Sequence, residues 1–389
     1  MSTLTTLGPQ DLEPLIDGAV DTDIVDGALR THRLAQPWRH QFPWGFTHLV
    51  EEQGSGVRLR FSTTASRLRL LVQSWRSAPV GAPEPSAQPF DLTCDGRVVS
   101  HGYADRHGIV RVDPVSGETR RGSAPTESVT FDLPPGGCGD ATIWLPYAEI
   151  TWLLGLEADA PVGPVHRSAR PRWVHYGSSI SHGAVAERPS AIWPVRAAAR
   201  AGVELVNLGV SGNAVLDPFA ARTIAAVPAG VISLKVGINI VNNDCLTARS
   251  FGPALHGFLD VLREAHPTAP ILLITALHCG LVEDRPGPTY LGDDGRFATH
   301  GVGSDVRLGK LTLRRTRELI AAVAHTRADA NLRVVDGLTL FGPADEATHA
   351  LPDGLHPDGA AHELIAQRFA PRLAAALTSA ALVPASSTL

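Results

Sequence analysis

The hydrophobic pattern of this chain changes character at residues 157–172, where a segment rich in alanine, proline and glycine interrupts it. Before that segment, apolar and polar residues alternate over short stretches bounded by turn-forming residues. The clearest of these stretches are Val57–Phe61, Arg67–Val72, Ser128–Leu133 and Thr142–Leu145. A two-residue period is typical of half-buried strands. We therefore predict that residues 1–160 form a β-sandwich domain of the jelly-roll type, followed by a linker at 161–171.

From residue 172 to 389, short apolar runs alternate with helical stretches. The candidate strands are Trp173–Tyr176, Glu204–Leu208, Val231–Val236, Ile271–Leu277 and Leu332–Val335. Helical patterns between them include Phe251–Ala265 and Val306–Ala324. This order of elements predicts an α/β domain in which helices cover both faces of a parallel sheet. A chain of 389 residues with 44% hydrophobic content is long enough for two packed domains.

A serine follows the first of these candidate strands, and an aspartate and a histidine lie near the C-terminus. Ser179 stands in the string Tyr-Gly-Ser-Ser-Ile-Ser, and the distant string Asp-Gly-Leu-His-Pro contains Asp353 and His356. A serine hydroxyl is a poor nucleophile at neutral pH, so it needs a nearby base and a carboxylate that orients this base. The pairing therefore suggests a serine esterase.

Two further segments are suited to stabilise the oxyanion that forms when an ester carbonyl is attacked. They are Asn207–Asn213 and Lys235–Asn239, and each follows a β-rich run. Both should therefore lie at the carboxyl end of a strand, where open α/β sheets bind ligands. Gly212 allows a backbone N–H to approach the substrate closely, and the side chain of Asn239 supplies a second N–H.

Taken together, these four ordered segments resemble the conserved blocks of the SGNH (GDSL) hydrolase superfamily over residues 172–378. The resemblance implies a three-layer α/β/α (flavodoxin-like) catalytic domain and a reaction without cofactor or metal. It also implies roles for individual residues, which are Ser179 as nucleophile, Asp353 and His356 as the rest of the triad, and Ser179 N–H, Gly212 N–H and the Asn239 side chain as the oxyanion hole.

Two positions depart from the family pattern. The usual aspartate before the nucleophile is Ser178 here, and Ile240 follows the oxyanion asparagine where an aspartate is common. Neither position takes part in bond making. We therefore expect both changes to alter local hydrogen bonding rather than to abolish activity.

Each site residue also has a simpler structural explanation. Ser179 and its neighbour Ser178 could cap a helix, Asp353 could belong to a Pro-Asp-Gly turn, and Asn239 could be a loop residue. His182 is a rival base, but it lies only three positions from Ser179, so we interpret it as a groove-lining or structural side chain. The joint occurrence of the four segments favours the catalytic interpretation.

Trp193 lies just beyond the nucleophile segment, and two interpretations of it stay open. It could bind substrate as a wall of the acyl pocket, or it could be a core residue. The long insertion at 280–304 is expected to border the substrate groove, because loops of this length commonly serve binding. Three tryptophans of the first domain could offer a sugar-stacking platform, although burial is their commoner use: Trp38, Trp44 and Trp75.

Several other functions lack their sequence signatures. The chain has no Gly-x-Ser-x-Gly and no His-Glu-x-x-His string, and its cysteines lack the spacing of a zinc site. The four cysteines are predicted to be free, mostly buried thiols in a reducing compartment, and they are Cys94, Cys138, Cys245 and Cys279. A net charge of -5 without basic runs disfavours nucleic acid as a partner.

The N-terminus shows no secretory pattern, and no apolar run is long enough for a membrane span, so a cytoplasmic location is predicted. A β-sandwich in front of an SGNH domain is similar to two-domain carbohydrate esterases. The function expected is removal of a short acyl group, such as acetyl, from a glycoside or a related small metabolite. Two alternatives stay open, namely an acyltransferase in natural-product or lipid tailoring and a non-catalytic glycan-binding protein.

Overall fold

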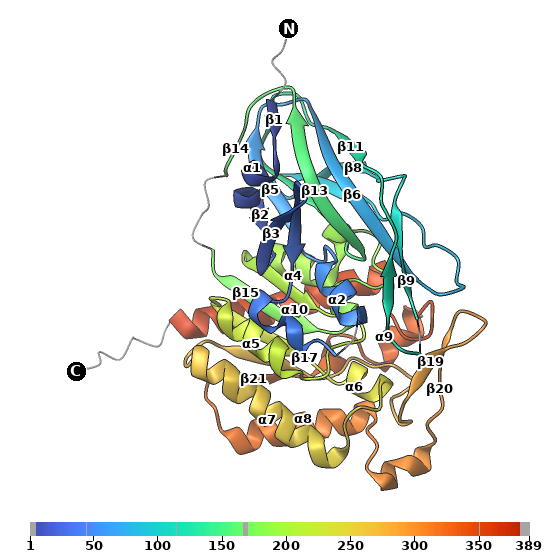
Figure 1. The fold of residues 1–389 in the computed structure, drawn as a ribbon. Helices are drawn as coiled ribbons and strands as arrows, with labels where there is room; N and C mark the ends of the chain where they lie inside the picture. Colours follow the sequence, from blue (N-terminus) through green and yellow to red (C-terminus); the bar gives the residue numbers. More distant parts are fainter. Residues whose placement is uncertain (1–4, 44, 114, 166–169, 350, 382–389) are drawn as a thin grey trace. The chain divides into compact units, whose positions relative to one another are not determined.

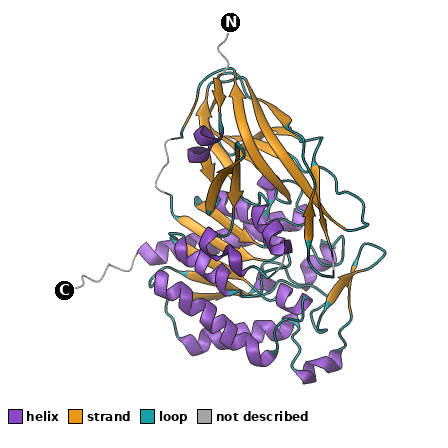
Figure 2. Cartoon of the chain, in the orientation of Figure 1, coloured by secondary structure: helices purple, strands orange, loops and turns teal. Residues whose placement is uncertain are grey.

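The computed structural model describes residues 5–43, 45–113, 115–165, 170–349 and 351–381 (Figures 1 and 2). The chain divides into two units. The first comprises Met1–Ala169 with Arg188–Ala191, and the second comprises Arg170–Glu187 with Ile192–Leu389. Within the described ranges, no helix is long and apolar enough to cross a membrane.

The first unit is built from two sheets. In the described residues, the larger sheet has the order β10 (Thr119–Arg121), β9 (Gly108–Val112), β6 (Arg67–Pro79), β13 (Glu149–Ala158), β4 (Ala28–His32) and β3 (Asp21–Val25), with β1 (Thr5–Leu7) beside β13 and β11 (Glu127–Asp132) beside β6. The smaller sheet has the order β14 (Val162–Gly163), β5 (Arg58–Thr63), β12 (Cys138–Trp144), β7 (Phe90–Cys94) and β8 (Arg97–Gly102), with β2 (Ile16–Asp17) beside β5. The short strand β14 lies inside the segment predicted to be a linker.

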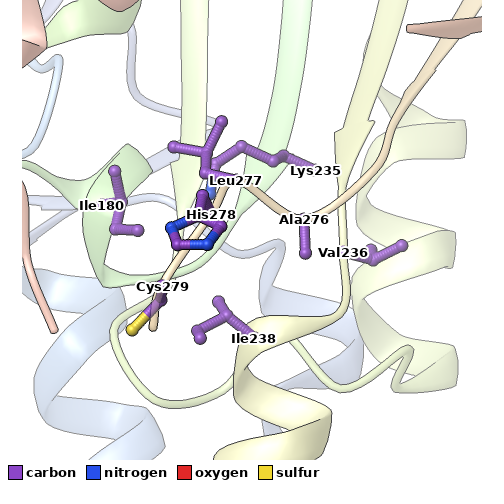
Figure 3. A pocket seen from close by; sticks show the side chains of 8 residues that line it. All are labelled: Ile180, Lys235, Val236, Ile238, Ala276, Leu277, His278 and Cys279. Atoms are coloured by element: carbon purple, nitrogen blue, oxygen red, sulfur yellow. The ribbon is translucent and has the colours of Figure 1, made fainter. Parts of the chain in front are cut away.

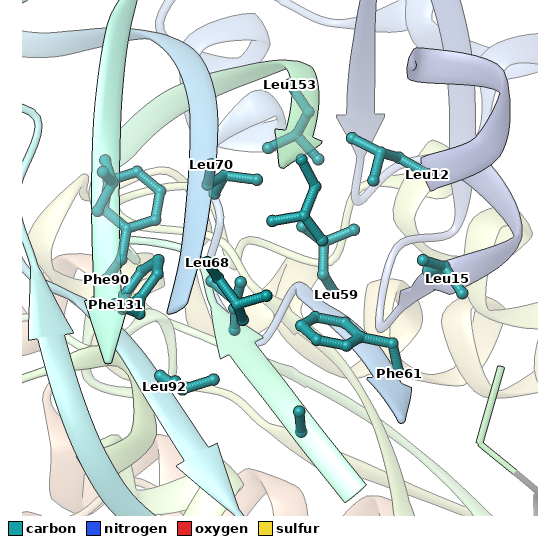
Figure 4. Packing of buried hydrophobic residues seen from close by; sticks show 14 of the residues in the cluster. Leu12, Leu15, Leu59, Phe61, Leu68, Leu70, Phe90, Leu92, Phe131 and Leu153 are labelled. Atoms are coloured by element: carbon teal, nitrogen blue, oxygen red, sulfur yellow. The ribbon is translucent and has the colours of Figure 1, made fainter. Parts of the chain in front are cut away.

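Both sheets contribute to one apolar core, which Figure 4 shows in part. Along β6, Leu68 and Leu70 are fully buried, whereas Arg67 and Arg69, which alternate with them, are exposed. Phe61 of β5 is buried in the same core. The two-residue alternation in the sequence therefore marks the inward face of the strands, and the prediction of a β-rich domain before an α/β domain is confirmed.

The prediction of four free thiols is wrong. Cys94 at the end of β7 and Cys138 at the start of β12 form a disulfide, with their Cα atoms 5.7 Å apart. These strands are neighbours in the smaller sheet, and their pairing brings the two thiols together. Only Cys245, which is exposed, and Cys279, which is buried, are free cysteines. The cytoplasmic location rested partly on the thiols, so it loses that support and stays a prediction.

Trp75 is a core residue rather than part of a sugar platform. Its side chain is 4% exposed, packs against Trp152 at 4.7 Å between ring centroids, and donates from Nε1 to the carbonyl of Gly122 at 2.7 Å. Trp38 is half-buried, and Trp44 lies outside the described residues.

The second unit contains a parallel sheet with the strand order β16 (Glu204–Gly209), β15 (Arg172–Gly177), β17 (Val231–Lys235), β18 (Ile271–Ile274) and β21 (Leu332–Val335). This is the flavodoxin-like order that the resemblance implied. Helix α4 (Trp193–Ala201) packs with α10 (Gly359–Ala381), while α7 (Ala248–Ala265) packs with both α5 (Pro218–Ala226) and α8 (Leu313–Arg327). Because crossovers are right-handed, the reversal of strand order at β15 places these two groups on opposite faces.

The shorter elements complete the description of the chain. They are α1 (Pro9–Leu12), η1 (Glu13–Leu15), η2 (Gln36–Gln41), α2 (Gly45–Glu52), α3 (Ser179–His182), η3 (Pro189–Ala191), α6 (Ile238–Asn242), β19 (Thr289–Leu291), β20 (Phe297–Thr299), η4 (Gly303–Leu308), η5 (Gly337–Thr339) and α9 (Pro343–Thr348).

Several element boundaries differ from the sequence prediction. Strand β18 ends at Ile274 rather than at Leu277. The helix predicted from Val306 begins only at Leu313, because Gly309 adopts a left-handed conformation with φ of 90° and interrupts it. Thr312 then caps the true helix by accepting a hydrogen bond from the backbone N–H of Arg315 at 3.2 Å.

Candidate active site

The site lies at the carboxyl ends of β15 and β17, which are neighbours in the sheet. Ser179 is the first residue of α3, directly after β15, and Asn239 lies in α6, directly after β17. The strand order reverses at β15, and such a point in an open sheet leaves a crevice between the loops of adjacent strands. The sequence therefore places both side chains where α/β folds bind ligands.

Ser179, His356 and Asp353 form a continuous hydrogen-bonded chain. The Oγ atom of Ser179 lies 2.7 Å from Nε2 of His356, and Nδ1 of His356 lies 2.6 Å from Oδ2 of Asp353. With the proton on Nδ1 donated to the carboxylate, Nε2 is left to accept the serine proton. His356 is 8% exposed, so its ring orientation is fixed by these contacts inside the protein.

The carboxylate of Asp353 is held in its ionised form. Partial burial would raise its pKa, but the hydrogen bond and charge of His356 outweigh burial, and the pKa is lowered to about 2. The backbone N–H groups of Leu355 and His356 also donate to Oδ1, at 2.9 Å and 2.8 Å. The turn Asp-Gly-Leu-His thus fixes the carboxylate through its own backbone and leaves Oδ2 for the imidazole.

Three N–H donors around the nucleophile have no acceptor within the described residues. They are the backbone N–H of Ser179, the backbone N–H of Gly212 and the Nδ2 amide of Asn239. The first is an unsatisfied donor because Ser179 opens a helix, whose first turn leaves such groups unpaired. Unpaired donors on converging loops can bind an oxyanion.

Two hydrogen bonds join the loops that carry these donors. The N–H of Ala214 donates to Oδ1 of Asn239 at 3.2 Å, and this contact leaves the Nδ2 group of the same amide for another partner. The side chain of Asn243 donates to the carbonyl of Gly212 at 2.8 Å. Gly212 has a φ of 71°, a conformation that favours glycine.

His182 is placed as a structural residue, in agreement with its interpretation from the sequence. Its Nδ1 lies 2.9 Å from the carbonyl oxygen of Gly209, and the residue is 1% exposed. Helix α3 packs closely on the end of β16 here, since a Cβ atom at Gly209 would lie 2.4 Å from the backbone nitrogen of His182. Only glycine fits at that position.

Trp193 lies in the core and does not line the acyl pocket. The residue is fully buried and packs against Trp173, His175 and Phe369, with ring centroids 6.0, 4.8 and 5.4 Å away. A side chain without exposed surface cannot contact a substrate. The substrate-binding interpretation of Trp193 is therefore replaced by its core alternative.

A small cavity lies beside the nucleophile and contains residues that the sequence analysis did not single out (Figure 3). It is partly open to solvent and has room for about one water-sized group, about 10 Å³. Its lining includes Ile180, which follows the nucleophile, and Ile238, which precedes Asn239; the other lining residues are Lys235, Val236, Ala276, Leu277, His278 and Cys279. Isoleucines next to catalytic motifs carry no signal of their own in a single sequence.

His278, labelled in Figure 3, comes from the loop after β18. Its Nδ1 lies 2.7 Å from Oε2 of Glu346, whose carboxylate also accepts from the N–H of Gly280 at 3.0 Å. This pair therefore gives the cavity a polar group of fixed orientation.

The insertion at 280–304 forms a hairpin of β19 and β20 that contacts the histidine segment. The N–H of Phe297 donates to the carbonyl of Asp353 at 2.8 Å, and the Phe297 ring meets the His356 ring edge-on, with centroids 5.6 Å apart. The insertion thus packs against the base of the triad, and its place beside a substrate groove stays a prediction.

Comparisons with known proteins agree with this arrangement. Residues 171–281 match the GDSL-like lipase/acylhydrolase family. This match includes three of the four segments, while Asp353 and His356 lie beyond it. Among curated proteins, no relative is detected from the sequence.

Solved structures resemble this chain over nearly its whole length. The salicylyl-acyltransferase SsfX3 from a tetracycline biosynthetic pathway is 26% identical, with 96% of this chain and 97% of that chain covered and a TM-score of 0.77. A GDSL-like lipase from Bacteroides ovatus is 19% identical over 97% and 98% of the two chains, with a TM-score of 0.68. A family two carbohydrate esterase from Cellvibrio japonicus is 12% identical over 97% and 99%, with a TM-score of 0.59. The predicted resemblance to the SGNH (GDSL) hydrolase superfamily is confirmed.

Proposed function

We propose that this protein transfers a short acyl group through an acyl-enzyme on Ser179, with water as the acceptor, and is therefore a serine esterase. The observation that carries the proposal is the unbroken hydrogen-bonded chain from Ser179 through His356 to Asp353. An arrangement in which a nucleophile contacts a base and the base contacts an orienting carboxylate is recognised by geometry rather than by chain order.

The reaction follows from the positions of these groups. His356 Nε2 accepts the Ser179 proton as Oγ attacks the ester carbonyl, and the resulting oxyanion takes hydrogen bonds from Ser179 N–H, Gly212 N–H and Asn239 Nδ2. The C–O bond to the alcohol then breaks, and the imidazolium gives its proton to the departing oxygen. Water, deprotonated by the same imidazole, attacks the acyl-enzyme, and the proton returns to Ser179 as the acid leaves.

The cavity beside Ser179 supports a short acyl group, such as acetyl. Its walls are mostly apolar and leave room for about one water-sized group, about 10 Å³, so a long acyl chain would not fit in it. The alcohol portion is proposed to be a glycoside or a related small metabolite. The support for this portion is the fold-level likeness to the carbohydrate esterase from Cellvibrio japonicus.

An acyltransferase is the second candidate. Its specific support is the 26% identity and near-complete coverage shared with a salicylyl-acyltransferase. Such a reaction uses the same acyl-enzyme, with an acceptor alcohol in place of water. The third possibility, a glycan-binding protein without activity, is disfavoured because the three triad residues keep their hydrogen bonds.

The test is hydrolysis of p-nitrophenyl esters from acetate to longer acyl chains by the wild-type protein and by Ser179→Ala. Ser116→Ala, which changes an exposed serine of the first unit, is the matched control. Activity that falls with chain length and disappears only in Ser179→Ala supports the esterase. Product analysis with added alcohols then distinguishes free acid from a new ester, and the new ester would favour the acyltransferase.

A further inference from the structure

Lys235 is a buried amine directly behind the nucleophile. It ends strand β17, is 2% exposed, and donates from Nζ to the hydroxyl of Ser178 at 3.2 Å. Ser178 is fully buried and is the N-cap of the helix that begins with Ser179. One hydrogen bond therefore separates this amine from the residue that precedes the nucleophile.

No carboxylate neutralises Lys235 within the described part of the chain. Its only hydrogen-bond partner there is the Ser178 hydroxyl. A buried lysine is normally paired, because a solitary charge is costly away from water. Burial accordingly lowers the pKa of Lys235 to about 7, so that the amine gains or loses its proton near neutral pH.

The surroundings of Lys235 include three histidines and a thiol, and none of these four groups is hydrogen-bonded to its amine in the described structure. His175 on β15 and His362 on α10 both have pKa values lowered chiefly by burial, with the charge of Lys235 contributing. His278 and Cys279 line the same cavity, and burial raises the pKa of the Cys279 thiol to about 12.

We propose that Lys235 is a positioning residue of the acyl-transfer site, whose amine fixes Ser178 behind the nucleophile and whose protonated form places a positive charge behind the oxyanion. This inference rests on the proposed function of Ser179. The resting site offers the Lys235 amine no counter-ion. The negative charge that develops on the oxyanion during the reaction would supply one. Because the site is poorly solvated, that charge acts on the amine with little screening.

The role has a consequence for the pH dependence of the reaction. Loss of the Lys235 proton produces an alkaline limb of kcat/KM near pH 7. Lys235→Met should remove the alkaline limb and lower kcat at pH 6 by on the order of tenfold. Ser178→Ala should move the limb to lower pH, because the protonated amine then loses its acceptor.

The chain offers a matched control, since its only two lysines are Lys235 and Lys310. Lys310 is paired with Asp244 at 2.8 Å and is partly exposed. Lys310→Met should therefore leave the alkaline limb unchanged. In the NMR spectrum of protein labelled with 13C-lysine, only two Cε signals are expected, one for each lysine. The Lys310→Met variant shows which of the two belongs to Lys235.

The decisive experiment is titration of the Lys235 signal before and after Ser179 is converted into an anionic tetrahedral adduct by a p-nitrophenyl phosphonate. The expected result is a rise of at least one pH unit in the Lys235 titration on adduct formation. An unchanged titration, or an alkaline limb that persists in Lys235→Met, would overturn the inference. Mass spectrometry reports adduct formation separately, and failure to modify Ser179 would overturn the proposed function and the inference with it.

Discussion

The hydroxyl oxygen of Ser179 lies 2.7 Å from Nε2 of His356, although 177 positions separate the two residues in the chain. Because the two groups act as a unit, Ser179→Ala and His356→Ala should each lower kcat by a factor of roughly 10⁴ or more. The double variant should be no slower than either single one. Ester hydrolysis by the three variants tests this, and additive losses would contradict a shared role.

Asp353→Asn should cost nearly as much as loss of the nucleophile. The amide NH₂ that replaces Oδ2 would donate to Nδ1 of His356, so the ring proton would move to Nε2 and the ring could no longer accept from Ser179. A loss in kcat of about 10³ to 10⁴ is expected. Asp353→Ala, which does not impose the wrong tautomer, is the comparison, and it should retain more activity than Asp353→Asn.

Asp353 should also contribute to acid stability. Its pKa is lowered in the folded protein to about 2, so its stabilising effect is present above the unfolded pKa near 4 and is lost as the pH falls toward 2. The difference in unfolding free energy between wild type and Asp353→Asn should shrink by about 2 kcal/mol over that interval. Denaturant unfolding at pH 5 and pH 2 measures it. A constant difference would argue against the depressed pKa.

Asn239→Ala should lower kcat by about 10² to 10³ and leave KM nearly unchanged, because the donor acts on the oxyanion and not on the resting carbonyl. Asn239→Asp keeps the acceptor for Ala214 N–H but opposes the oxyanion with a negative charge, so it should be slower still. Steady-state kinetics of both variants provide the measurement. A change confined to KM would indicate a role in substrate binding instead.

Removal of the disulfide by Cys94→Ser and Cys138→Ser together should destabilise the first unit. The bond spans 44 positions, for which loop closure predicts at most about 4 kcal/mol. Thermal unfolding of the double variant measures the loss, and Cys245→Ser, at an exposed free thiol, is the control. Titration of the unfolded, unreduced wild type should find two thiols, whereas four would show that the bond does not form.

The catalytic sheet was predictable because buried parallel strands are short continuous apolar runs. The run at Val231–Val236 extends one residue past the fully buried strand β17, and the run at Glu204–Leu208 is one residue short of β16. Each site segment directly follows such a run or lies in a compact turn. Local sequence therefore located Ser179 and Asn239.

The errors concern properties that depend on distant parts of the chain. The Cys94–Cys138 bond follows from the register of β7 against β12, which no local pattern specifies. Trp193 stands at the start of a helix, and its burial depends on Trp173 and Phe369 from other elements. The sequence predicted no separate role for Lys235, since its isolation from carboxylates is a property of the folded interior.

Phe297 of the inserted hairpin donates a hydrogen bond to the carbonyl of Asp353, and Asp353 orients the general base His356. The hairpin therefore helps to position the base. Relatives of a common ancestor can usually exchange such insertions to acquire new substrates while their chemistry stays intact. Here the hairpin residues would serve both substrate choice and the positioning of His356. A remodelled hairpin that accepted a different alcohol would also realign the imidazole, so selectivity and turnover in this lineage are expected to evolve together.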